Sequence, residues 1–203
     1  MARILSLLLL LMTGAVQGQT LVVLGDSLSA GYRMEASESW PSILPEALEE
    51  AGKPDIKVVN ASISGDTTGN GLDRLTAVLD EHNPDWVLIE LGANDGLRGF
   101  SPKVIRTNLD QIIRQVQDAG STPILMQIQV PPNYGKRYSE AFAHVYPSLS
   151  VEYDVPLLPF FLEQVILKKG WMMDDGLHPK PEAQPWIADH IAGQLTPLLA
   201  DRK

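Results

Sequence analysis

Four short stretches of this chain combine residue types that could carry out acyl transfer. They are Gly25-Asp26-Ser27-Leu28-Ser29, Ser62-Ile63-Ser64-Gly65-Asp66-Thr67, Gly92-Ala93-Asn94-Asp95-Gly96 and Asp174-Asp175-Gly176-Leu177-His178-Pro179. Acyl transfer needs a nucleophile, a base that takes its proton, a group that orients the base, and donors for the oxyanion. The stretches predict Ser27 as the nucleophile, His178 as the base and Asp175 as the orienting carboxylate, with Asp174 as the alternative to Asp175.

The same stretches supply candidate donors for the oxyanion. These are the backbone N–H groups of Ser27 and Gly65 and the side-chain amide of Asn94. Taken alone, Gly25-Asp26-Ser27 favours a simple turn with a helix cap, since all three residue types are common in turns. Asn94 could likewise be a left-handed turn residue. The four stretches together favour the catalytic interpretation over these simpler ones.

Other chemistries fit the same residues less well. Asp174, Asp175 and His178 could bind a metal, but no second histidine or carboxylate cluster completes the site, so we expect no metal and no cofactor. The glycine-rich segment 65–71 is not followed by Gly-Lys-Ser/Thr and is not a phosphate loop. Serine at position 29 excludes the Gly-x-Ser-x-Gly elbow of α/β-hydrolases.

A parallel sheet is the element that would bring these loops together. Apolar segments separated by helical patterns predict five strands, at Thr20–Leu24, Ile56–Val59, Trp86–Leu91, Ile124–Val130 and Val155–Phe160. Five strands that alternate with helices predict an α/β protein with three layers, α/β/α, and right-handed crossovers. Three of the loops then lie at one edge of the sheet. A helix over residues 139–153 contains Pro147, which predicts a kink or break.

Composition restricts the class of protein and its partners. The 203 residues are 44% apolar and 20% charged, which is typical of a globular chain, and we expect one domain over residues 19–203. The formal charge of −9 argues against nucleic acid and against an anionic membrane surface as electrostatic partners. The chain has no cysteine, so it has neither a thiolate nucleophile nor a lipid-modified N-terminal cysteine.

The N-terminus resembles a secretory signal. Met1-Ala2-Arg3 precedes the apolar run 4–12, and Val16 and Gly18 suit a cut after Gly18. The run is shorter than the ~20 residues that a membrane-spanning helix needs. We therefore expect residues 1–18 to be a cleaved signal peptide, with a periplasmic or secreted product and no stable insertion into the membrane.

The four stretches, in this order from Gly25 to His178, resemble the GDSL or SGNH hydrolase family. The fuller matches Asn60–Thr67 and Gln127–Tyr134 are similar to its bacterial secreted thioesterase I / protease I / lysophospholipase group. The family spacing Asp-x-x-His favours Asp175 over Asp174. The resemblance implies a flavodoxin-like SGNH fold and a periplasmic serine esterase that needs no metal or cofactor, and we expect a monomer. It implies small-molecule substrates: acyl thioesters, lysophospholipids, aryl esters and simple esters.

Two alternatives remain at this point. One is a carbohydrate O-acetyl esterase of the same fold, and the other is a non-catalytic protein that binds acyl chains or glycans.

The segment 95–101 after Asn94 is expected to be a loop that carries Leu97 and Phe100. These two residues could pack on the next helix. We expect them instead to close over the acyl chain of the substrate, with Pro131 and Tyr134 on the opposite wall.

Overall fold

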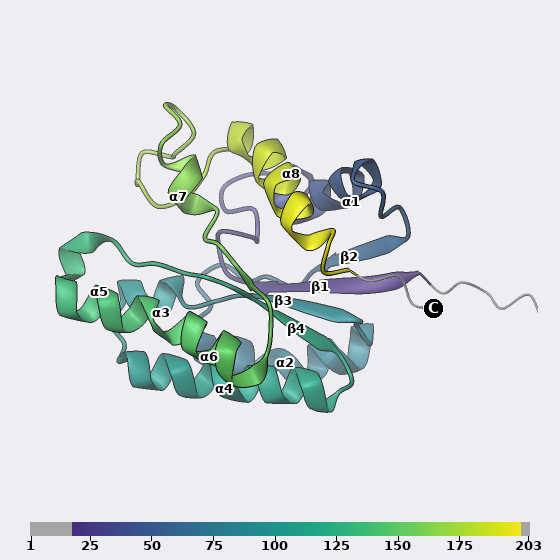
Figure 1. Cartoon of the computed structure of the whole chain (residues 1–203). Helices are drawn as coiled ribbons and strands as arrows, with labels where there is room; N and C mark the ends of the chain where they lie inside the picture. The colour runs from purple at the N-terminus through teal and green to yellow at the C-terminus, as the bar shows by residue number, and fades with distance from the viewer. Residues whose placement is uncertain (1–17, 200–203) are drawn as a thin grey trace, which may run out of the picture.

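The computed structural model describes residues 18–199, which form a five-stranded parallel sheet between two layers of helices (Figure 1). The strands are β1 (Gln19–Gly25), β2 (Ile56–Asn60), β3 (Trp86–Glu90), β4 (Thr122–Met126) and β5 (Leu157–Leu158), in the order β2-β1-β3-β4-β5. The predicted three-layer α/β fold is confirmed. Of the predicted signal peptide, only Gly18 lies within the described residues. No helix in residues 18–199 is long and apolar enough to cross a bilayer.

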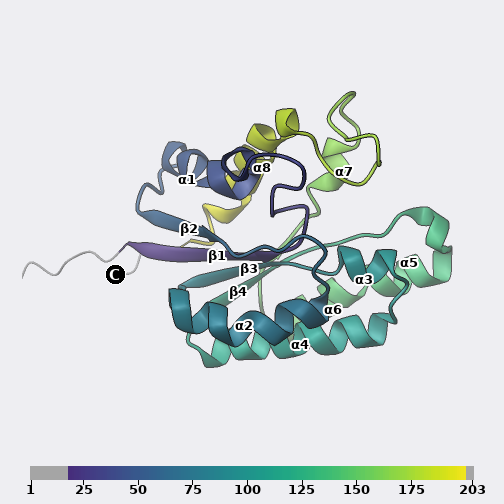
Figure 2. The same cartoon turned by 180° about the vertical axis from the view of Figure 1, so that it is seen from behind.

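The helices divide between the two faces of the sheet. Helices α1 (Trp40–Glu50) and α8 (Gln184–Leu195) cover one face, and Figure 2 shows the opposite layer from behind. That layer holds α2 (Thr68–His82), α3 (Ala93–Leu97), α4 (Pro102–Asp118), α5 (Lys136–Ala143) and α6 (Val145–Tyr153). The remaining helices are α7 (Leu162–Val165) and three 3₁₀ turns at Ala36–Glu38, Pro132–Tyr134 and Pro181–Ala183.

The strand order places the carboxyl ends of β1 and β3 side by side. Gly25, the last residue of β1, pairs with Glu90, the last residue of β3. The chain leaves β1 towards one face and β3 towards the other, so a crevice opens beyond these two strand ends. Ser27 and Asn94 follow the two strands within a few residues and therefore meet at this crevice.

Helices α1 and α8 are joined at their first turns. The backbone N–H of Trp40 donates to Oε1 of Gln184 over 2.9 Å, and both residues are buried. The indole Nε1 of Trp40 donates to the carbonyl of Leu28 over 3.1 Å. Trp40 thereby links the segment after β1 to the start of the last helix.

The predicted break at Pro147 is confirmed, and it falls at His144, between α5 and α6. Proline has no N–H, so Pro147 leaves the carbonyl of Ala143 without its usual helical donor. The side-chain amide of Gln127 donates to this carbonyl over 3.1 Å. The Gln127 side chain thus supplies the hydrogen bond that Pro147 cannot donate to the Ala143 carbonyl.

The main differences from the sequence-based expectation lie at β4, β5 and α3. Strand β4 ends at Met126 rather than Val130, and β5 has only two residues, because these two strands pair over only two positions. Residues 95–97, predicted to be loop, belong to helix α3. Asn, Asp and Gly are poor helix formers, so the helix is not visible in the sequence. The buried carboxylate of Asp95 secures it, by accepting from the N–H and the hydroxyl of Thr68 over 2.8 and 2.6 Å.

Candidate active site

Ser27, His178 and Asp175 form one hydrogen-bonded series. Nε2 of His178 lies 2.9 Å from the Ser27 Oγ, and its Nδ1 lies 2.8 Å from Oδ2 of Asp175. Ser27 follows β1, whereas the other two residues lie in the loop before α8. The carboxylate that contacts the imidazole is Asp175 and not Asp174. The arrangement can pass a proton from the serine hydroxyl to the imidazole.

The loop that carries the histidine is held from both sides. Met172 and Pro179 form an antiparallel bridge, and the N–H of Met173 donates to the carbonyl of His178 over 2.8 Å. Oδ1 of Asp175 accepts from the N–H groups of Leu177 and His178 over 2.9 and 3.0 Å. Partial burial raises the pKa of Asp175, but these two N–H groups and the imidazole outweigh it and lower the pKa to about 2. The carboxylate is therefore ionised at neutral pH and accepts the Nδ1–H of His178.

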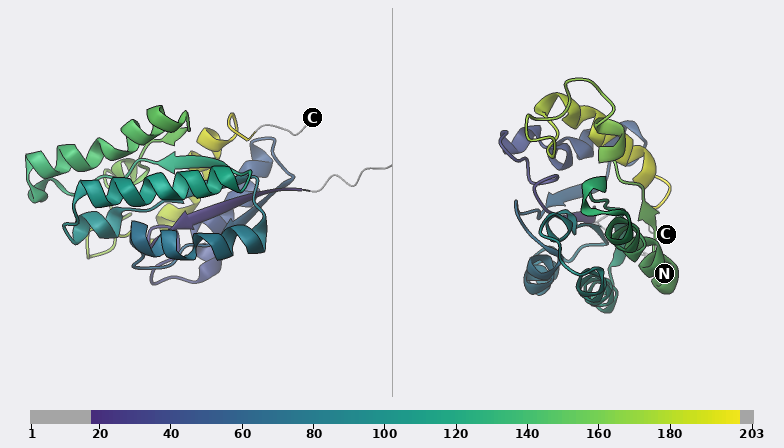
Figure 3. Two further views of the ribbon diagram at one scale, coloured as in Figure 1. Left: turned by 90° about the horizontal axis from the view of Figure 1, so that it is seen from below. Right: turned by 90° about the vertical axis from the view of Figure 1, so that its left-hand side faces the viewer.

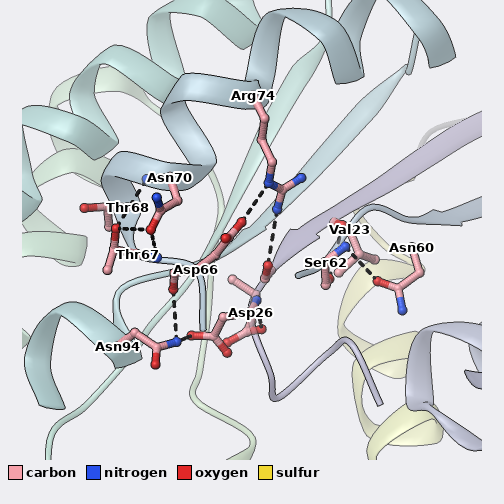
Figure 4. Close-up of polar contacts among 12 residues, drawn as sticks. Val23, Asp26, Asn60, Ser62, Asp66, Thr67, Thr68, Asn70, Arg74 and Asn94 are labelled. Atoms are coloured by element: carbon pink, nitrogen blue, oxygen red, sulfur yellow. Dashed lines mark hydrogen bonds and ion pairs between the residues drawn. The ribbon is translucent and has the colours of Figure 1, made fainter. Parts of the chain in front are cut away.

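The predicted oxyanion donors meet at the same place. Ser27, Gly65, Asn94 and His178 all line one cavity of about 380 Å³. Gly65 has φ +88°, in the left-handed region that side chains rarely adopt. Asn94 lies in the first turn of α3, and its Nδ2 contacts Oδ2 of Asp26 over 3.1 Å and the carbonyl of Asp66 over 3.0 Å (Figure 4).

Two arginines fix the loop after β2 in this position. Arg74 of α2 donates from Nε to the Asp66 carboxylate over 2.7 Å and from Nη2 to the Gly25 carbonyl over 3.4 Å (Figure 4). Arg98 donates to the carbonyl of Gly65 over 3.0 Å. Because these contacts bridge the loops after β1, β2 and β3, the orientation of the Gly65 peptide is set by the fold.

Several residues at the site were not predicted from the sequence. Tyr32 lines the cavity, and its ring stacks on His178 with centroids 4.1 Å apart. Glu90 is fully buried beside Asp26, and its Oε2 accepts from the hydroxyl of Ser29 over 2.6 Å. A carboxylate in a strand that is otherwise apolar was the only available signal for Glu90. Tyr32 follows a turn with no periodic pattern, so nothing in the sequence indicates it.

The wall of the cavity is mainly apolar and includes two of the four residues predicted to bind the acyl chain. Leu97 and Pro131 line it, together with Leu28, Tyr32, Ala93, Val130 and Leu177. Phe100 and Tyr134 are not among the lining residues, and Phe100 is 40% exposed. Tyr134 contacts a lining residue instead of the cavity itself, because its hydroxyl donates to the carbonyl of Leu97 over 2.8 Å. Within residues 18–199, no group of three His, Cys, Asp or Glu side chains could hold a metal ion.

A parallel α/β sheet with four such loops at its edge is the arrangement expected of an acyl hydrolase. The chain belongs to the GDSL-like lipase/acylhydrolase family, whose model matches residues 23–184. The predicted family and enzyme class are thereby confirmed.

Relatives cover nearly the whole chain. It is 61% identical to an arylesterase of Vibrio mimicus over 197 residues, or 96% of this chain and 98% of the relative. It is 56% identical to the thioesterase 1/protease 1/lysophospholipase L1 of Escherichia coli K12 over 192 residues, or 95% of this chain and 90% of the relative. The solved psychrotrophic esterase EstA from Pseudoalteromonas sp. gives a TM-score of 0.86 at 42% identity and covers 90% of this chain and 100% of its own.

The buried pair Asp26 and Glu90 leads to a prediction about stability. Burial raises the pKa of Asp26 from 3.8 to about 7, with further contributions from the charges of Asp95 and Asp66, and burial also raises the pKa of Glu90. Between pH 3.8 and about pH 7, Asp26 therefore keeps its proton in the folded chain, whereas the unfolded chain has lost it. The free energy of unfolding should therefore fall as the pH rises through this range, by ~2–4 kcal/mol from Asp26.

Asp26→Asn should remove this contribution, since an amide does not titrate. We expect the free energy of unfolding of the variant, from urea titrations at about pH 4 and about pH 7, to fall less with pH than that of the wild type. The quantity compared is the change in the free energy of unfolding with pH. A loss of stability that is the same at both pH values does not alter this change. Equal slopes in the two proteins would mean that Asp26 titrates near its ordinary pKa in the folded state.

Proposed function

We propose that this protein hydrolyses acyl esters and thioesters, with Ser27 as the nucleophile and His178 as the general base. The observation that carries the proposal is the hydrogen-bonded series from Ser27 Oγ through His178 to Asp175. Two close relatives are named as an arylesterase and as a thioesterase and lysophospholipase, which supports this range of substrates. A hydroxyl, an imidazole and an ionised carboxylate in this order are the groups that acyl transfer requires.

In the first half of the cycle, the Ser27 oxygen attacks the carbonyl carbon and its proton passes to Nε2 of His178. The carbonyl oxygen becomes an oxyanion, which the N–H groups of Ser27 and Gly65 and the amide of Asn94 bind. The nitrogen of Asn94 already contacts two acceptors, so one of its N–H groups is shared with the oxyanion. The bond to the thiol or alcohol then breaks, the leaving group takes the proton from His178, and the acyl group stays on Ser27.

In the second half, water attacks the acyl-enzyme and gives a proton to His178. The bond between the acyl carbon and Ser27 breaks, the serine oxygen regains its proton, and the carboxylic acid leaves. Asp175 orients the imidazole and stabilises its protonated form in both halves. The cycle returns Ser27 and His178 to their starting protonation states and uses no cofactor.

A fluorophosphonate probe tests the proposal directly. It should form one stable adduct, and mass mapping of peptides should place that adduct on Ser27. A folded wild-type protein that stays unlabelled would favour the alternative of a binding protein without catalysis.

The apolar cavity is the proposed binding site for the acyl chain. Leu97 and Pro131 form its walls, while Tyr134 supports Leu97 from outside. Each methylene that enters contributes up to ~0.8 kcal/mol. An apolar wall suits an acyl chain better than a sugar, so this cavity favours an acyl ester over an O-acetylated carbohydrate.

Leu97→Ser should therefore lower kcat/KM for long-chain esters several-fold and leave acetyl esters of the same leaving group near the wild-type value. Phe100→Ser is the matched control, because Phe100 is on the same segment but outside the cavity. A parallel loss on both substrates in Leu97→Ser would indicate collapse of α3. Equal activity of the wild type, Leu97→Ser and Phe100→Ser on long-chain esters would mean that the acyl chain binds outside this cavity.

Asn94→Ala should lower kcat by ~10²–10³ with a smaller change in KM, as the removal of one oxyanion donor does. The reason is that the amide acts on charge that develops only in the transition state. Steady-state kinetics on one aryl ester, with a urea unfolding curve as the control for stability, would measure it. An unchanged kcat would return Asn94 to the role of a turn residue.

We further propose that residues 1–18 direct export and are removed, and that residues 19–203 act as one monomeric domain in the periplasm or outside the cell. The mass of the protein recovered from the periplasmic fraction tests this, with Gln19 expected as the first residue.

A further inference from the structure

The segment after α7 presents two large apolar side chains to solvent. Ile166 is 56% exposed and Leu167 is 82% exposed. They are the only sequence neighbours among the exposed large hydrophobic residues of the described chain, which are Ile63, Phe100, Val104, Val151, Ile166 and Leu167. We call residues 166–169 the tip, and all four are exposed.

The tip is a hydrogen-bonded turn. The N–H of Ile166 donates to the carbonyl of Leu162 over 2.9 Å, and the N–H of Lys168 donates to the carbonyl of Val165 over 3.0 Å. The N–H of Trp171 then closes the turn on the carbonyl of Lys168 over 3.2 Å. Because these bonds fix the backbone, the two aliphatic side chains are held outward at a defined place.

Cationic and aromatic residues follow this apolar pair, whereas the exposed Glu163 precedes it. Lys168 and Lys169 follow it directly, and Nζ of Lys168 lies 5.5 Å from the ring of Trp171 and 6.0 Å from that of Trp186. Two exposed aliphatic side chains followed by two exposed lysines and nearby indole rings suit a lipid surface, which offers acyl chains, anionic headgroups and an interface that favours tryptophan. The net charge of the chain is −9, so any attraction to an anionic surface must be local.

The tip is directly connected to the loop that carries the proposed base. The N–H of Lys180 donates to the carbonyl of Trp171 over 2.7 Å, and the bridge between Met172 and Pro179 encloses Asp175 and His178. Figures 1 and 3 show α7 and the segment after it at the same end of the sheet as α3 and α5. A surface that binds the tip therefore lies at the end of the molecule where the cavity is found.

We propose that the tip docks on an anionic phospholipid surface, with Ile166 and Leu167 among the acyl chains and Lys169 at the headgroups. Docking is reversible and involves no membrane span. It brings the cavity close to amphiphilic substrates held in that surface. The proposal goes beyond the hydrolytic activity, because docking does not depend on the chemistry of Ser27.

The test measures binding to vesicles of phosphatidylglycerol and phosphatidylcholine. The protein is purified in the form that accumulates in the expressing cells, and mass spectrometry verifies that each variant has the same N-terminus. The double variant Ile166→Ser, Leu167→Ser should bind about tenfold more weakly than the wild type. Lys169→Gln should weaken binding to these vesicles and lose the preference over phosphatidylcholine alone. Val151→Ser is the matched control, since Val151 is 83% exposed on α6, and it should bind as the wild type does.

A second measurement separates docking from catalysis. The double variant should hydrolyse a water-soluble acetyl ester at the wild-type rate and a lysophospholipid embedded in the vesicles several-fold more slowly. Ser27→Ala should bind vesicles as tightly as the wild type, so the binding result stands even if the proposed chemistry fails.

Three outcomes would overturn the proposal. They are no binding of the wild type to the vesicles, equal binding by the double variant, and a wild-type dimer that the double substitution converts to a monomer. The third outcome would mean that the tip is a contact surface between two copies of the chain.

Discussion

Replacing Ser27 with alanine should abolish hydrolysis and leave the fold intact. The loss of a triad nucleophile lowers kcat by ~10⁴–10⁶. The side chain is half-buried, and the His178 imidazole that its hydroxyl contacts lines the same cavity, so its removal takes no partner from a fully buried polar group. The measurements are kcat on an aryl ester and a thioester and the urea midpoint. A folded variant with a tenth of the wild-type activity would contradict the assignment of the nucleophile.

Ser29 provides a matched control two residues further on. Its hydroxyl is buried and donates to Glu90 over 2.6 Å. Ser29→Ala should therefore lower the free energy of unfolding by about 1–3 kcal/mol, because the buried carboxyl of Glu90 loses its hydroxyl donor and keeps only the longer contact from the N–H of Asp26. It should keep kcat within a few-fold of the wild type. The two serines would then separate chemistry from stability within one loop.

The second large effect is expected at Asp175. Asp175→Asn should lower kcat by ~10⁴, because an amide cannot hold Nδ1–H of His178 as the carboxylate does and permits the wrong tautomer. Asp174→Asn should leave kcat close to the wild-type value, since it is Asp175 that contacts the imidazole. Kinetics of the two variants on one ester would decide between the neighbours. Equal losses would show that both carboxylates act on His178.

The convergence of Ser27, Gly65 and Asn94 could be predicted because parallel strands end at one edge of a sheet. Strands such as Trp86–Glu90 are visible as buried apolar runs. The parts that could not be predicted depend on side-chain direction. Asp95 secures α3 through Thr68, a residue far away in the sequence, and no local pattern reports that bond.

The same limit applies to the cavity wall. Leu97 and Phe100 are three residues apart in a segment that was expected to be a loop. Helix α3 ends at Leu97, and this places Leu97 in the wall and leaves Phe100 outside it. Tyr32 stacks on a residue from the other end of the chain, which sequence spacing cannot indicate.

The link between Trp40 and Gln184 has a consequence for the order of events during folding. The proposed nucleophile follows the first strand, whereas the proposed base lies in the loop before the last helix, and the two helices that come next meet at this buried hydrogen bond. A growing chain that has completed only the first four strands has a serine but no histidine to activate it. Contacts between distant segments form late, because they must first overcome the entropy of closing a long loop. Catalytic activity should consequently be the last property to return on refolding, and its recovery reports that the final helix has docked.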